Sequence, residues 1–193
     1  MSLWRVAARG WRIHVPVVVA NALVQAATTL PFLTPAASAS FILLTLASFA
    51  ALAAAAALVA AQAAASAGSF PFRWPSWTLW MSAAIVVLLV GTGSLISPFV
   101  VPVACAVAII VLTGAAARPS RPFAAFRLFA NAPLRAIGLS LLTLVVLGLL
   151  WVVALLLGLF VTGALGSGLT WLVFGAVAVV LIAAWTESSR RHL

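Results

Sequence analysis

Long apolar runs, separated by short stretches that contain proline, glycine or arginine, make up most of this chain. A membrane-spanning helix needs about 20 consecutive, mostly apolar residues, and six runs reach that length. The predicted spans cover residues 15–34, 39–66, 77–96, 99–117, 135–162 and 167–186. The pattern therefore predicts an all-α, polytopic integral membrane protein that forms one transmembrane domain over residues 1–193.

The composition of individual runs predicts their place in the bundle. Alanine fills residues 53–57 without a break, and small residues allow helix backbones to approach closely in lipid. We therefore expect the span 39–66 to be central. The span 135–162 is rich in leucine and valine, and we expect it to face lipid.

The start of the chain allows a second interpretation. Arginines precede the first apolar run, and Ala37-Ser38-Ala39 resembles the cleavage site of a signal peptide. Cleavage there would leave five spans. The first run is long enough to span a membrane, so six spans are favoured.

Two segments are predicted to form short amphipathic helices in the membrane interface, at residues 2–14 and 120–131. In each, arginines lie beside an aromatic stripe, and a third aromatic–arginine stretch connects the second and third spans. Aromatic rings below the headgroups with arginines reaching the phosphates explain this pattern, and the same surface could dock a protein partner. The candidate residues are Trp4, Arg5, Arg9, Trp11, Arg12, Arg73, Trp74, Phe123, Phe126, Arg127 and Phe129.

Charge supports the membrane assignment and orients it. Only 6% of the 193 residues are charged, whereas soluble domains carry roughly 25%. The chain has ten arginines and no lysine. Each arginine lies near a terminus, in the connection between the second and third predicted spans, or in or at the edge of the connection between the fourth and fifth. Because cytoplasmic loops are enriched in arginine, both termini are predicted to be cytoplasmic in a bacterial plasma membrane. A net charge of +9 without a water-soluble basic domain does not indicate nucleic-acid binding.

The inventory of reactive side chains argues against an enzyme. The chain has two histidines, one cysteine (Cys105) and one acid (Glu187), with no aspartate, lysine or tyrosine. General acid–base chemistry and metal binding usually draw on these residue types. We expect no catalytic residues, no metal and no cofactor.

Neutral polar side chains within the spans are the remaining candidates for a site. Asn21 and Gln25 are four residues apart and share a helix face, and Gln62 is predicted to lie at a similar depth. An Asn21–Gln62 hydrogen bond between the first two spans is one interpretation, and a polar patch for a neutral substrate is the other. Trp151 lies near the middle of its span. It could pack in the core, or it could form the wall of a pocket.

Two stretches of the sequence resemble the YesL family of small bacterial membrane proteins. They are Asn21-Ala22-Leu23 followed by residues 30–36 (Leu-Pro-Phe-Leu-Thr-Pro-Ala), and residues 126–135, which precede an apolar helix. The resemblance implies a six-helix accessory protein that works beside sugar uptake systems. In size, topology and small-residue content the chain is also similar to the substrate-binding membrane subunits of energy-coupling-factor vitamin transporters.

Two functions follow as hypotheses. The first is a non-catalytic accessory or assembling subunit of a transport or envelope complex, with anionic lipid headgroups and a protein partner or second copy as contacts. The second is a carrier or substrate-binding subunit with a neutral pocket for a small molecule or lipid. A membrane enzyme that relies on a partner for its chemistry is a third reading, which the residue inventory disfavours.

Overall fold

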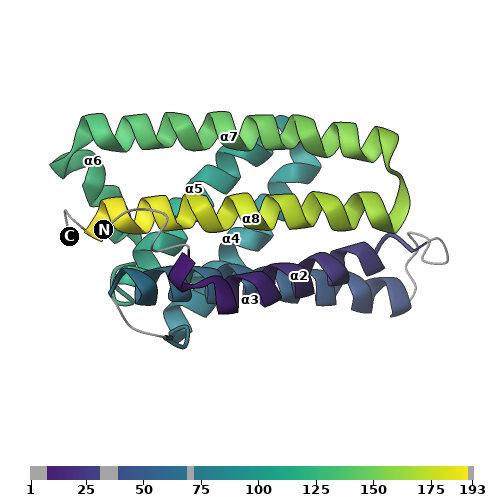
Figure 1. Ribbon diagram of the computed structural model, residues 1–193, viewed down its shortest axis with the longest axis horizontal. Helices are drawn as coiled ribbons and strands as arrows, with labels where there is room; N and C mark the ends of the chain where they lie inside the picture. The colour runs from purple at the N-terminus through teal and green to yellow at the C-terminus, as the bar shows by residue number, and fades with distance from the viewer. Residues whose placement is uncertain (1–7, 31–38, 69–71, 191–193) are drawn as a thin grey trace.

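The computed structural model describes residues 8–30, 39–68 and 72–190. Their regular structure is entirely helical (Figure 1). Five helical segments are long and apolar enough to cross a membrane. They are α3 (Ala39–Ala67), α4 (Trp77–Ile96), η1 with α5 (Pro98–Ala117), α7 (Pro133–Phe160) and α8 (Gly163–Arg190). The all-α prediction is confirmed. Several long apolar helices indicate a multi-pass membrane protein.

The first predicted span corresponds to a shorter helix. Helix α2 (Trp11–Ala27) has 17 residues, and the predicted end of that span, at residue 34, lies outside the described residues. A sixth membrane span therefore stays a prediction.

Local signals explain several helix ends. The Ser76 side chain accepts a hydrogen bond from the Leu79 backbone N–H at 3.3 Å and caps the start of α4. The tight turn predicted at Ser97-Pro98 is present, because Ser97 is extended and Pro98 opens the short 3-10 helix η1 (Pro98–Val100). Gly163 opens α8 with a φ of 73°, in the left-handed region that favours glycine.

The described parts of the two predicted interfacial helices differ from the prediction, and residues 2–7 of the first lie outside the described residues. Residues 11–14 belong to α2, which continues through Pro16 without a break, so no helix boundary separates positions 14 and 15. The second segment is divided into a 3-10 helix, η2 (Pro122–Phe126), and one α-helical turn, α6 (Arg127–Asn131). Helix α6 ends because Ala132, which precedes Pro133, cannot easily adopt the α conformation.

The centre of the bundle is α5 (Val101–Ala117), not the alanine-rich helix α3. Ten of the 17 residues of α5 are buried, compared with nine of the 29 residues of α3. Burial in α3 is confined to residues 57–67, toward its C-terminal end. The leucine-rich helix α7 exposes most of its large side chains, as expected for a helix that faces lipid.

Helices α2 and α8 pack closely and run in opposite directions, with α7 beyond α8 and with α4 and α5 behind (Figure 1). Their register is fixed by two contacts. A Cβ on Gly175 would lie 2.5 Å from Val18, and the Ser167 hydroxyl donates to the Gln25 carbonyl oxygen at 3.2 Å. Small residues on α8 thus bring the α2 backbone close to it.

The arginines gather at one end of the bundle. Helix α6, the start of α7 and the end of α8 lie at the same end in Figure 1, and the start of α2 lies on the side of the end of α8 because these two helices are antiparallel. We call this the arginine end, and its described arginines are Arg9, Arg12, Arg73, Arg118, Arg121, Arg127, Arg135 and Arg190.

Candidate binding cavity

A partly open cavity of about 430 Å³ lies within the helix bundle, and we call it the central cavity. Side chains of α2, α3, α4, α5, α7 and α8 line it, and the lining is predominantly apolar. Its volume falls within the roughly 300–1,000 Å³ that is usual for small-molecule sites. Apart from the thiol of Cys105, the described lining contains no Asp, Glu, His, Lys, Arg or Tyr side chain.

The polar part of this cavity is built from α2 and α3. The Gln25 Nε2 amide donates to the Ser48 carbonyl oxygen at 3.2 Å. In return, the Ser48 hydroxyl donates to Gln25 Oε1 at 2.6 Å. Gln25 Nε2 also donates to Asn21 Oδ1 at 3.3 Å. All three residues line the central cavity, so an amide cluster interrupts its apolar wall.

The backbone carbonyl of Ser48 fixes the orientation of both amides. A carbonyl oxygen can only accept, so the Gln25 atom that faces it must be the Nε2 donor. The second Nε2 hydrogen then points to Asn21, which must present Oδ1. The Asn21 Nδ2 group is left with no hydrogen-bond partner in the described part of the chain. It is a donor at the cavity wall for an acceptor on a ligand.

Gln62 does not join this cluster. Its Nε2 amide donates to Ser66 Oγ at 3.2 Å, and Gln62 is not part of the cavity lining. The helix register explains the difference from the predicted Asn21–Gln62 bond. Gln62 lies fourteen residues beyond Ser48, or about 21 Å along α3, whereas Asn21 lies four residues, about 6 Å, from Gln25. The prediction placed the start of the first span at residue 15, and the helix begins at Trp11.

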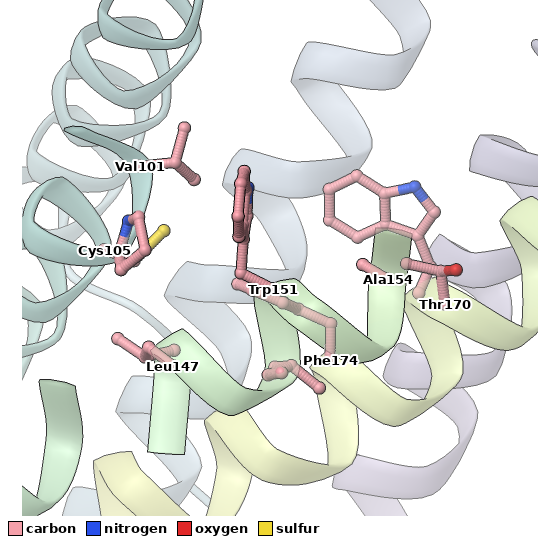
Figure 2. Close-up of a pocket in the computed structure, with 10 residues that line it drawn as sticks. Val101, Cys105, Leu147, Trp151, Ala154, Thr170 and Phe174 are labelled. Atoms are coloured by element: carbon pink, nitrogen blue, oxygen red, sulfur yellow. The ribbon is translucent and has the colours of Figure 1, made fainter. Parts of the chain in front are cut away.

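Trp151 lines a second, smaller space. This side chamber has a volume of about 170 Å³ and lies between α5, α7 and α8. Figure 2 shows the Trp151 ring projecting between Val101 and Cys105 on one side and Thr170 on the other. The ring centroids of Trp151 and Phe99 are 5.5 Å apart. Trp151 therefore lines the side chamber, and a role as the wall of a binding pocket stays a prediction.

The sequence analysis did not identify three residues of these sites: Ser48, which completes the amide cluster, and Trp171 and Phe174, which line both the central cavity and the side chamber. Ser48 was not singled out, because a serine in an apolar helix ordinarily bonds to its own backbone. Trp171 and Phe174 form an edge-to-face pair with centroids 5.7 Å apart and line both spaces. Their spacing of three residues on one helix face was the available signal.

The interfacial candidates lie at the arginine end, apart from the cavity. Trp11 and Trp74 are 58% and 69% exposed, and the Arg12 guanidinium carbon lies 5.9 Å from the Trp11 ring centroid. Phe123 is 66% exposed, whereas Phe129 is partly buried. Trp4 and Arg5 fall outside the described residues.

The phenylalanines of this end form a continuous series of ring contacts into the core. Successive centroids from Phe123 to Phe126 and from Phe126 to Phe129 are each 6.2 Å apart. Phe129 then lies 6.3 Å from Trp185, which is fully buried. The series anchors η2 and α6 against α8.

Within the described residues, no three His, Cys, Asp or Glu side chains lie together where they could hold a metal ion. The chain matches no protein-family model, and comparisons with curated proteins and with solved structures return no match.

Proposed function

We propose that this chain is a non-catalytic membrane protein that binds a small, neutral and largely apolar molecule in its central cavity. The observation that carries the proposal is the Asn21 Nδ2 group, which has no hydrogen-bond partner among the described residues and lies at the wall of a largely apolar, uncharged cavity. Small-molecule sites typically combine an apolar lining with a few polar groups that orient the ligand. An amide donor that opens on an apolar cavity and has no partner there is costly, which favours an occupied cavity.

In this proposal α2 is a sixth span and both termini are cytoplasmic, in a bacterial plasma membrane. The clustering of the described arginines at one end supports the orientation, because arginine-rich ends stay on the cytoplasmic side. The lack of a proton-transferring side chain in the described lining, other than the Cys105 thiol, favours binding or carriage over catalysis.

Replacing Asn21 with leucine is expected to weaken binding about two- to tenfold, the loss of one neutral hydrogen bond. The measurement is native mass spectrometry of the protein in phosphatidylcholine nanodiscs, which reports the small molecule retained by the wild type. The matched control is Gln62→Leu, an identical loss of an amide outside the cavity. Equal occupancy in Asn21→Leu and wild type, or an empty wild-type cavity, would contradict the proposal.

A second candidate function is an accessory subunit that docks a protein at the arginine end. The exposed aromatic residues Trp11, Trp74 and Phe123 beside arginines favour it, since aromatic residues and arginine are enriched at protein interfaces. The resemblance to the YesL family implies the same role.

This second function predicts a stoichiometric partner after mild detergent extraction. The double variant Trp74→Ser with Phe123→Ser is expected to lose that partner while it stays folded, because both side chains are exposed. The control is Phe160→Ser, an aromatic residue 82% exposed at the opposite end of α7. Retention of the partner by the double variant would contradict docking at this end.

A further inference from the structure

The central cavity and the side chamber share part of their walls. Five residues line both: Val101, Cys105, Leu147, Trp171 and Phe174. The two spaces therefore adjoin, with these residues between them. A flexible molecule could extend from one into the other by rotation of these side chains, which is a local motion.

The side chamber is suited to hydrocarbon. Its surface is almost entirely apolar. The one hydroxyl in its lining, on Thr170, donates to the Gly166 carbonyl oxygen of its own helix at 2.8 Å. The lining also includes the indole N–H groups of Trp151 and Trp171, but polar atoms contribute almost nothing to its surface. A polar headgroup in this space would therefore lose most of its hydrogen bonds to water without replacement, whereas a hydrocarbon chain would contact leucine, valine and indole surfaces.

The polar end of such a molecule would lie at the amide cluster. Gln25 Nε2 already donates to Asn21 Oδ1 and to the Ser48 carbonyl oxygen, whereas Asn21 Nδ2 has no hydrogen-bond acceptor in the described structure. The group that matches it is a hydrogen-bond acceptor such as a carbonyl, ether or hydroxyl oxygen. No described arginine lines the cavity, so a phosphate or carboxylate headgroup would enter without a counter-charge, at high cost.

The register of α2 and α8 places the polar end and the hydrocarbon end of such a ligand at about the same position along the helix axes. Val18 faces Gly175, and Gln25 faces Ser167. Asn21 therefore lies between these contacts, opposite the turns of α8 that carry Trp171 and Phe174. A chain that starts at Asn21 reaches the side chamber by crossing the bundle.

On this basis we infer that the ligand is a neutral, single-chain amphiphile, with its hydrogen-bond acceptor at Asn21 and its hydrocarbon chain in the side chamber. This inference rests on the proposed function and narrows its substrate class to lipid-like molecules.

Cysteine reporters test the inference, because Cys105 is the only cysteine in the chain. In a Cys105→Ala background, Ala178→Cys reports on the central cavity alone and Ala154→Cys on the side chamber alone. The rate of alkylation by N-ethylmaleimide is measured in phosphatidylcholine nanodiscs. The probes are butyrylglycerol, myristoylglycerol and myristate, and Ala130→Cys at the exposed arginine end is the control.

Myristoylglycerol is expected to slow alkylation of both reporters about tenfold, which corresponds to roughly 90% occupancy. Butyrylglycerol is expected to protect only Ala178→Cys, and myristate neither. Protection of Ala178→Cys by both glycerides, without protection of Ala154→Cys, overturns the side-chamber inference and leaves the proposed function intact. Equal protection by myristate overturns the neutral headgroup. No protection of Ala178→Cys by either glyceride overturns both the inference and the proposed function.

A second measurement needs no engineered cysteine. Myristoylglycerol with a photoactivatable diazirine at the end of its chain is expected to label the wild-type protein at α7 peptides that contain Trp151 and Ala154. Labelling confined to α3 or α4 overturns the placement of the chain.

Discussion

Replacement of Trp185 with alanine is expected to lower the free energy of unfolding by about 3 kcal/mol or more. The Trp185 side chain is fully buried, and its Nε1–H donates to Thr143 Oγ1 on α7 at 3.0 Å. Its removal leaves a large cavity between α7 and α8 and ends the contact with Phe129. In a membrane protein the unfolded helices already lie in an apolar solvent, so lost packing contributes most of this effect.

The measurement is equilibrium unfolding in mixed micelles with increasing sodium dodecyl sulfate. Trp185→Phe separates the two contributions, because it keeps most of the ring and loses only the hydrogen bond, for a cost of about 1 kcal/mol beyond the small volume change. Trp11→Ala, at a tryptophan that is 58% exposed, is the matched control and should change stability little. A Trp185→Ala variant as stable as this control would contradict the packing described for α8.

The second large effect is expected at Gly114, on the buried face of α5. A Cβ at this position would collide with the Pro122 carbonyl oxygen and lie 3.0 Å from the Ala125 backbone nitrogen. Both atoms belong to the backbone of η2, so no change of rotamer relieves the contact. Gly114→Ala is therefore expected to cost about 3 kcal/mol, at the upper end for overpacking, and to displace η2 and the phenylalanine series from α5.

Gly148→Ala in α7 is the matched control, because a Cβ there meets nothing within 4 Å. Alanine is a better helix former than glycine by up to about 1 kcal/mol, so this variant should be as stable as the wild type or more stable. The same unfolding assay measures both variants. Equal stability of Gly114→Ala and Gly148→Ala would contradict the close approach of η2 to α5.

The sequence predicts helices well where hydrophobicity and strong local signals coincide. The predicted span 77–96 matches the observed helix α4 (Trp77–Ile96), because Ser76 caps its start and Pro98 follows its end. The prediction is less accurate near residue 11. The alternation of arginine and tryptophan there fits an interfacial helix as well as the first turn of α2.

Contacts between helices are what the sequence could not supply. Asn21, Gln25 and Gln62 were recognised as unusual in apolar helices, and Gln25 is indeed hydrogen-bonded across α2 and α3. Its partner is Ser48 instead of another amide, because pairing depends on the register of two helices and not on residue type. For the same reason, the alanine tract of α3 indicated a close contact without identifying α5 as the centre.

The uncharged lining of the central cavity also bears on energetics. A neutral molecule held there would move no net charge through the bilayer, so the membrane voltage would do no work on it. If the protein carries its ligand, as one form of the proposed function, the described lining residues supply no carboxylate, imidazole or amine to move a proton with it. For such a carrier, we would expect net flux to follow the difference in the ligand's chemical potential between the two leaflets.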